Sequence, residues 1–467
     1  MKRSLILLAA LSFACLSSFA QLKMPAYERS VLPNGVTVFT LVKKDVPLVT
    51  LKAVVKGGGE SEETSTAGLA DVTNDLLLRG TTKRSADQIA QDIDFLGAEI
   101  STASGESANE VELEVLSKDV KEGIGILGDL VLSPTFPEDE VAKELARAVD
   151  GARARKDRPQ SAIAAYANKF FFGSSGHPMG IVADEETLGR ITRENIVAYH
   201  AKYYVGANLV IVAVGDFDPA AVKAEIAKTF GSAPKGESFA WKPDPKVARA
   251  AKPRLLLVDD ADSTQTYFRI IQPGISRTSP DRIPMLVVNT LFGGRFTSML
   301  NDELRVNAGL TYGATSQMDQ DRLTGALTIS TFTATKTTGE AIDLALAVLN
   351  TLRSKGISAE QLASAKAYIK GSAPTSLLET SDQLANVLTG FAIYGFDERE
   401  INDFFAKIDA VSLEDAKRVI DTYYRDDGLT FVVLGQRSEI EAAVRKYAED
   451  FRMVDLNSAG IQIAAAH

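Results

Sequence analysis

Two periodicities of hydrophobic and polar residues alternate along the chain. Short stretches that alternate in polarity and are rich in β-branched residues predict β-strands. Longer stretches with apolar residues three and four positions apart predict amphipathic helices. Strands are expected at residues 36–42, 49–56, 111–116, 209–215, 254–258, 266–271, 325–333 and 429–435. Helices are expected at residues 68–78, 85–96, 117–131, 137–158, 280–291, 339–352 and 384–393, and one more begins at the capping pair Ser358 and Gln361.

One arrangement occurs twice: a capped helix, a Tyr-Tyr pair and an apolar strand that ends in glycine. Its landmarks are Thr192, Tyr204 and Gly215 in the first copy and Ser412, Tyr424 and Gly435 in the second, a constant offset of 220 residues. A long-period repeat of this kind predicts an internal duplication. Residues 21–233 and 254–467 are therefore expected to be two homologous halves, joined by a proline-containing linker at 234–253. The mixed order of strands and helices predicts an α+β fold, with a mostly antiparallel sheet packed against helices in each half.

Composition and charge narrow the function classes. Hydrophobic residues make up 45% and charged residues 24% of the 467 residues, which is typical of globular proteins. The formal net charge of −10, without a basic cluster, argues against nucleic acid or an anionic membrane as the partner.

The N-terminus predicts export. Lys2 and Arg3 precede an apolar run at residues 5–16, and Ala20 ends a small-residue cleavage site. Residues 1–20 are therefore interpreted as a signal peptide, and a periplasmic location is expected. The run is too short to cross a bilayer, and no later run is long enough. The single cysteine, Cys15, lies inside this segment, so the mature chain is expected to lack disulfides and thiolate nucleophiles.

The stretch 292–313 contains the first candidate catalytic and substrate-binding residues. We predict a helix that opens at Gly293 and Gly294 and stops near residue 309, followed by a short strand at 310–312. Arg305 ends the helix and Tyr312 lies in the strand, so a guanidinium and a phenol can face one cavity. Together they can hold a peptide carbonyl or stabilise an oxyanion. The alternative is a surface ion pair and a half-buried tyrosine.

The stretch 68–81, GLADVTNDLLLRGT, carries a resemblance to a known family. It resembles the zinc helix of the pitrilysin/insulinase-type metallopeptidases, in which H-x-x-E-H follows a G-L-A-type lead and precedes a K/R-G-T ending. Asp71 stands at the first histidine, Asn74 at the glutamate and Asp75 at the second histidine. The family's third ligand, a glutamate further along, falls on Gly151. No metal site is therefore expected in this chain.

The resemblance extends over nearly the whole mature chain, through short motifs that occur in the family's order. It implies paired halves that close over an unfolded peptide like a clam shell. Active members combine a zinc-bearing part with a part that supplies an arginine and a tyrosine, and in some bacteria the two are separate chains. Arg305 and Tyr312 match that pair, and Gly293 and Gly294 would allow close approach of the substrate backbone.

The function implied by the resemblance is that of a catalytically incomplete peptidase subunit. Its partner would be a homologous H-x-x-E-H chain that holds the zinc, and its substrate an unfolded peptide. Two alternatives stay open: a non-enzymatic scaffold or peptide-binding protein, and a peptidase that uses another metal at Asp71 and Asp75. The three histidines, His177, His200 and His467, are interpreted as structural or solvated.

Overall fold

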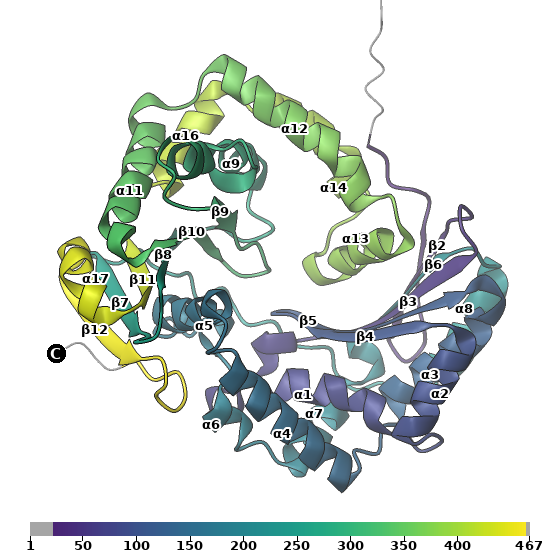
Figure 1. Ribbon diagram of the computed structural model, residues 1–467. Coiled ribbons are helices and arrows are strands. Elements are labelled where there is room, and N and C mark those ends of the chain that lie inside the picture. Colours follow the sequence, from purple (N-terminus) through teal and green to yellow (C-terminus); the bar gives the residue numbers. More distant parts are fainter. Residues whose placement is uncertain (1–21, 464–467) are drawn as a thin grey trace, which may run out of the picture.

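The computed structural model describes residues 22–463, so the predicted signal peptide and His467 lie outside the described residues. Two six-stranded sheets, each packed against helices, form the two halves of the molecule (Figure 1). Most strand pairs in both sheets are antiparallel, so the predicted α+β fold class is confirmed. Residues 234–250 contain neither helix nor strand; the domain boundaries themselves stay a prediction.

The first half holds strands β1 to β6 and helices α1 to α8. The strands are β1 Glu28–Val31, β2 Thr37–Val42, β3 Leu48–Lys56, β4 Glu99–Ser104, β5 Ala108–Leu116 and β6 Leu209–Gly215. The helices are α1 Leu69–Leu76, α2 Ala86–Leu96, α3 Val120–Leu132, α4 Glu138–Ala154, α5 Pro159–Phe172, α6 Glu185–Leu188, α7 Arg193–Tyr203 and α8 Pro219–Phe230. A 3₁₀ turn, η1 Gly58–Ser61, follows β3.

The second half holds strands β7 to β12 and helices α9 to α17. The strands are β7 Arg254–Asp259, β8 Gln265–Pro273, β9 Ala314–Met318, β10 Ala326–Ala334, β11 Thr430–Gly435 and β12 Asp450–Asp455. The helices are α9 Arg282–Asn289, α10 Met299–Asn301, α11 Thr338–Lys355, α12 Ala359–Leu377, α13 Ser381–Tyr394, α14 Arg399–Asn402, α15 Phe404–Ala410, α16 Leu413–Tyr423 and α17 Arg437–Val444. Two π-helical turns, η7 Thr290–Gly294 and η8 Asp302–Asn307, extend α9 and α10. Within residues 22–463, no helix combines the length and apolar character needed to cross a membrane.

The two sheets share one topology. The strand order β2-β6-β3-β5-β4 in the first corresponds to β7-β11-β8-β10-β9 in the second. In both, the first pair is parallel and the other three are antiparallel. Only the sixth strand differs: β1 is antiparallel to β2, whereas β12 is parallel to β7. This correspondence agrees with the duplication that the 220-residue offset predicts.

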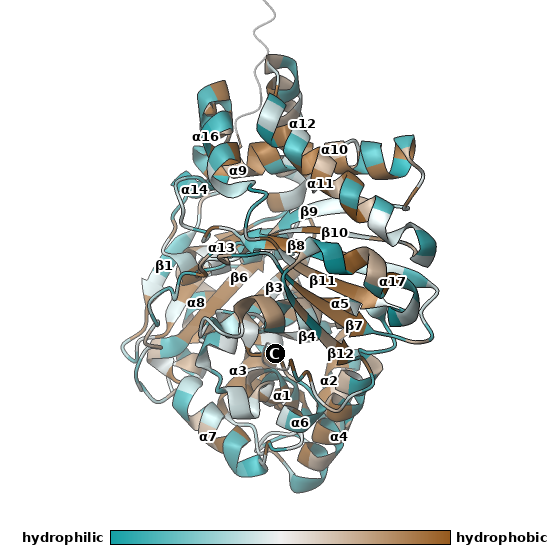
Figure 2. Cartoon of the chain, turned by 90° about the vertical axis from the view of Figure 1, so that its left-hand side faces the viewer, coloured by the Kyte–Doolittle hydropathy of each residue, from teal (hydrophilic) through white to brown (hydrophobic). Residues whose placement is uncertain are grey.

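The central strands are buried on both faces. Along β6, Leu209, Ile211 and Ala213 point into one core, while Val210, Val212 and Val214 point into another. Strand β11 divides its side chains in the same way. A continuous apolar run is the expected sequence for a strand covered on both sides, and Figure 2 shows these strands in brown at the centre of each sheet.

Each half covers one face of its sheet with its own helices and receives a helix from the other half on the second face. Helix α13 of the second half packs on β3 and β6, where its Leu384 and Leu388 meet Val210 and Val212. Helix α5 of the first half packs on β8 and β11, where its Ile163 and Phe170 join the core of the second sheet. The two halves are therefore interlocked by an exchange of helices (Figure 1).

Candidate functional site

The stretch around Gly293 differs from its prediction. Helix α9 continues into η7, which ends at Gly294, and a new helix starts at Met299 with Ser298 as its N-cap. The prediction that the two glycines open a helix is therefore wrong. Leu300 and Leu304, which follow them, are buried. A side chain at Gly293 would place its Cβ 2.3 Å from the backbone nitrogen of Ser316 in β9. Close packing of η7 on this strand explains Gly293.

Tyr312 lies in a loop, and the predicted strand at 310–312 is wrong. Gly309 ends the preceding turn with a positive φ of 65°, and the Leu310 N–H donates back to the Leu304 carbonyl at 2.8 Å. The Thr311 hydroxyl then accepts from the Gly313 N–H at 3.1 Å, which closes a local turn before β9 begins at Ala314. Tyr312 is left 82% exposed.

Arg305 is half-buried in η8 and stacks on an aromatic ring. Its guanidinium carbon lies 4.5 Å from the centroid of Phe296, which is itself 67% exposed, and the neighbouring Val306 is 66% exposed. Among residues 22–463, no ion pair or hydrogen bond engages the guanidinium, and none joins it to Tyr312. We call residues 296–312 the exposed segment. It presents a free cation, a phenol and apolar surface together.

Helix α1 carries the predicted degenerate metal positions. Gly68 has a φ of 94° and precedes the helix, and the carboxylate of Glu62 accepts from the N–H groups of Gly68 and Ala70 at 2.7–3.1 Å. This carboxylate therefore caps the helix from the turn after η1. Burial raises the pKa of Glu62 to about 7. The sequence analysis did not identify Glu62, because its partner groups are backbone atoms.

Asn74 is a buried structural residue. Its amide donates to the carbonyls of Ala103 in β4 and Glu110 in β5, at 3.0 and 2.9 Å. Its oxygen accepts from the hydroxyl of Tyr204, at 3.2 Å. The side chain is only 1% exposed and ties α1 to the sheet. All three contacts hold the amide in place, and an amide, unlike a carboxylate, cannot take a proton from a water molecule.

The second half repeats this contact. Asn289 in α9 donates to the carbonyl of Ser316 in β9 at 2.8 Å and accepts from the hydroxyl of Tyr424 at 3.3 Å. Tyr204 and Tyr424 are the equivalent second members of the two Tyr-Tyr pairs. The position that would carry the catalytic glutamate of the zinc helix thus makes the same asparagine–tyrosine bond as its counterpart in the second half.

Asp75, one of the two aspartates of α1, is engaged by neighbouring side chains. Asp75 accepts from the hydroxyl of Thr102, and its carboxylate lies 3.7 Å from the guanidinium of Arg147 in α4. Arg147 also pairs with the buried Glu144 at 2.6 Å. Although Asp71 is exposed, desolvation by neighbouring atoms and then the Asp75 carboxylate raise the pKa of its side chain.

Zinc does not fit this arrangement, because an arginine stands against the acidic pair and no third ligand is supplied. Gly151 is exposed on α4, and a Cβ there would meet no atom within 4 Å. Among residues 22–463, no group of three histidine, cysteine, aspartate or glutamate side chains is arranged to hold a metal ion.

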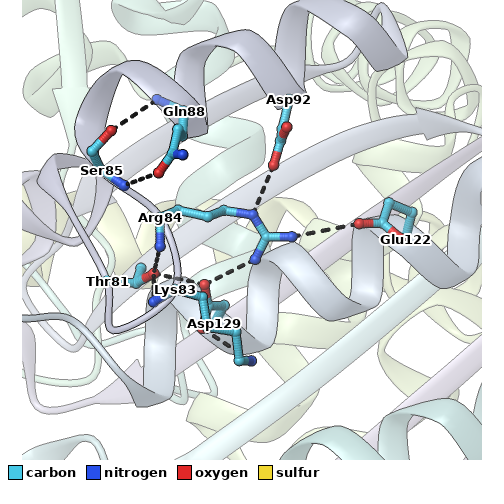
Figure 3. Close-up of polar contacts among 8 residues, drawn as sticks. All are labelled: Thr81, Lys83, Arg84, Ser85, Gln88, Asp92, Glu122 and Asp129. Carbon is cyan, nitrogen blue, oxygen red and sulfur yellow. Dashed lines mark hydrogen bonds and ion pairs between the residues drawn. The ribbon is translucent and has the colours of Figure 1, made fainter.

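The end of the family-like motif forms a polar cluster that joins α2 to α3 (Figure 3). The buried carboxylate of Asp129 accepts from the Thr81 hydroxyl at 2.7 Å and from Arg84 at 2.9 Å. Arg84 also pairs with Asp92 at 2.7 Å, and Ser85 and Gln88 form a capping box at the predicted start of α2. Burial alone would raise the pKa of Asp129, but these hydrogen bonds lower it. The cluster is structural.

The two described histidines are also structural. His177 is buried, and its Nδ1 accepts from the Met179 N–H at 3.1 Å. His200 contacts the Val131 carbonyl through Nε2 at 2.9 Å and stacks on Tyr204, with ring centroids 4.5 Å apart. Burial lowers the pKa of His200 to about 4.

The structure does not bring the two candidate regions together. Helix α1 lies toward the bottom of the molecule and α10 toward the top (Figure 2). Arg305 and Tyr312 therefore do not complete a site with Asp71, Asn74 and Asp75 of the same chain.

Comparisons with known proteins give a consistent set of relatives. Residues 38–170 match the family model described as Insulinase (Peptidase family M16), and residues 190–369 match the model described as Peptidase M16 inactive domain. An uncharacterized zinc protease of Mycobacterium bovis is 26% identical over 398 residues, which cover 84% of this chain and 90% of that protein. An uncharacterized zinc protease of Bacillus subtilis is 22% identical over 403 residues, which cover 86% and 96%.

Two solved structures share the fold. A peptidase M16 inactive domain from Pseudomonas fluorescens superposes with a TM-score of 0.80 at 24% identity, covering 88% of this chain and 98% of that one. A protease from Helicobacter pylori superposes with a TM-score of 0.78 at 19% identity, covering 88% and 100%.

Proposed function

This chain belongs to the insulinase-type peptidase family M16, and from that premise we propose that it is the zinc-free subunit of a two-chain peptidase. It would bind unfolded peptide and present Arg305 and Tyr312 to the H-x-x-E-H site of a homologous partner. Residues 1–20 would direct the chain to the periplasm.

The observation that carries this proposal is the contrast between α1 and the exposed segment. In α1, the position of the catalytic glutamate is taken by Asn74, whose amide is held by two strands and a tyrosine. In the exposed segment, Arg305 and Tyr312 are without polar partners among the described residues. Apart from the stacking of Arg305 on Phe296, this pair makes no polar contact within its own fold and is suited to act on another molecule.

The chemistry follows from the two side chains. The guanidinium offers fixed N–H donors and the phenol one O–H donor, and both can bond to a substrate carbonyl oxygen. Such donors stabilise the negative charge that develops on that oxygen during peptide hydrolysis. The relatives named zinc proteases support a peptidase role, and the zinc itself would be held by the partner.

The test is peptide hydrolysis by the mature chain alone and mixed with its H-x-x-E-H homologue. We expect activity only in the mixture. Arg305→Ala and Tyr312→Phe should each lower the kcat of the mixture, by about 10²–10³-fold for the arginine if it acts as an oxyanion donor. Arg437→Ala is the matched control, because Arg437 is an exposed arginine paired with Glu441 in α17. Zinc-dependent hydrolysis by this chain alone would contradict the proposal.

A second candidate function is that of a non-enzymatic scaffold or peptide-binding protein. The same buried Asn74 favours this function, because a residue that stabilises the fold at the position of the catalytic glutamate has a structural role without catalysis. If Tyr312→Phe and Arg305→Ala leave every activity of a purified complex unchanged, this second function replaces the first. A peptidase using another metal at Asp71 and Asp75 is disfavoured by Arg147 beside them.

A further inference from the structure

A cavity of about 490 Å³ lies in the second half, between helices α9, α12, α13 and α14. Its volume is in the range of sites that bind small ligands. Most of its wall is apolar and includes Leu286, Ile369, Phe391 and Phe404. Gly294 is at its edge, two residues before Phe296 of the exposed segment. The cavity therefore lies beside the region proposed to meet the substrate.

The charged groups of this cavity do not balance. Its lining contains three charged residues, Arg277, Arg282 and Glu400. Arg282 forms an ion pair with Glu400. Among residues 22–463, no carboxylate lies within ion-pair distance of the Arg277 guanidinium. The lining thus carries one more positive than negative charge, and Arg277 is its cation without an ion-pair partner. The carboxylates of Asp397 and Asp403 lie in the adjoining pocket, which Arg277 also lines.

Arg277 is also short of hydrogen-bond acceptors. Its Nε is buried and has no partner. Its guanidinium lies 5.8 Å from the ring centroid of Tyr394, whose hydroxyl is committed to Asp321 at 2.7 Å. A buried polar group without a partner is costly, so such groups usually meet one in a bound ligand or water. The guanidinium fork matches a carboxylate in shape and charge.

Most other polar groups of the lining are already engaged. The hydroxyls of Ser372 and Ser376 bond to helix carbonyls of α12, and the amide of Gln383 bonds to the Thr375 carbonyl. Within residues 22–463, the Gln320 amide contacts only the Met318 sulfur, at 4.0 Å. It therefore remains available in the same lining as Arg277, and an amide can hydrogen-bond to the main chain of a peptide.

We propose that this cavity binds the free C-terminal end of a peptide, with the terminal carboxylate on Arg277 and an apolar last side chain against the wall. The inference rests on the proposed function, since it assigns part of the substrate to this subunit. Binding in this cavity would give the two-chain assembly a preference for peptides whose last residue is apolar. Cleavage of a longer chain produces the free terminal carboxylate that such binding needs.

The test uses the mature chain without a partner. A fluorescein-labelled octapeptide ending in Ala-Leu-Phe is titrated by fluorescence anisotropy, once as the free acid and once as the C-terminal amide. We expect the amide to bind about 10- to 100-fold more weakly, the effect of losing charge-assisted hydrogen bonds. This comparison requires no variant, so it does not depend on the folding of one.

Variants then assign the effect to Arg277. Arg277→Gln should bring the acid and the amide to similar affinities, whereas Arg437→Gln, which removes one remote charge from the same half, should leave their ratio unchanged. Equal affinity of acid and amide for the unaltered chain, or an unchanged ratio in Arg277→Gln, would overturn the proposal. Octanoate, a carboxylate with an apolar tail and no amide, should compete at least tenfold more weakly than the peptide acid.

If octanoate competes as well as the peptide acid, the cavity does not recognise the peptide main chain, and the proposal that it binds a peptide end is overturned. The outcome is separable from that of the proposed function. If the two-chain mixture does not hydrolyse peptide but the chain still prefers the acid to the amide, only the peptidase role is refuted. If the mixture hydrolyses peptide but the chain binds acid and amide equally, only the role of this cavity is refuted.

Discussion

Replacing Asn74 by alanine tests whether this buried residue stabilises the fold. The change removes two N–H donors from the buried carbonyls of Ala103 and Glu110. It also removes one acceptor from the Tyr204 hydroxyl, which keeps a second contact with Asn109 at 3.5 Å. Two buried carbonyls that each lose a partner cost about 1–2 kcal/mol apiece, so the free energy of unfolding should fall by about 2–4 kcal/mol.

The assay is urea unfolding of the mature chain, followed by far-UV circular dichroism. Asn289→Ala should cost a similar amount, because it breaks the equivalent bond in the second half. Asp71→Ala, on an exposed position of the same helix, should change the free energy by no more than about 0.5 kcal/mol. The structural interpretation is refuted if Asn74→Ala unfolds within about 0.5 kcal/mol of the unaltered chain. Asn74→Glu should also destabilise and should not create hydrolysis.

Three other outcomes are expected. Gly293→Ala should destabilise by about 1–3 kcal/mol in thermal unfolding, because its Cβ would collide with Ser316, while Gly371→Ala meets no atom within 4 Å and should be neutral or stabilising. The pKa of Glu62 is about 7 in the folded chain, compared with an ordinary value of 4.5. Its contribution to stability is therefore complete below pH 4.5 and is lost as the pH rises through about 7. The free energy of unfolding should fall by about 3 kcal/mol over this range. Glu62→Gln should remove that part of the pH profile, and an unchanged profile would refute the assignment. Elemental analysis of the purified chain should find well under one zinc per chain; one tightly held zinc that Asp75→Ala releases would contradict this.

The sequence was informative wherever a pattern is local. The run at 209–215 gave the bounds of β6, and the capping pairs at Ser85 and Ser358 gave helix starts that the structure confirms. Edge strands were missed, because they lack apolar runs: β1 is exposed throughout, and β4 alternates between exposed and half-buried positions. Hydrophobic periodicity detects burial, so strands with little burial escape it.

The identity of the candidate site residues stays a prediction, whereas their geometry can be compared with the structure. The loss of ligands in α1 was visible from residue types alone. That Asn74 would bond to two strands depends on β4, which had not been predicted, and on a tyrosine 130 residues away. Gly293 and Gly294 were wrongly predicted to open a helix. A glycine pair can mark either an unusual backbone conformation or close packing, and the sequence does not distinguish the two. Arg277 could not be identified from the sequence, because the lack of a partner for its Nε is visible only in the structure.

The exchange of α5 and α13 has a consequence for how this molecule can move. Separating the halves would expose the apolar faces that each helix covers, so hinge opening within one chain would resemble partial unfolding. A protease nick in the segment 234–250 should then leave two fragments that remain together on gel filtration. We therefore expect any rearrangement that admits a polypeptide to occur at a boundary with another molecule and not between the two halves.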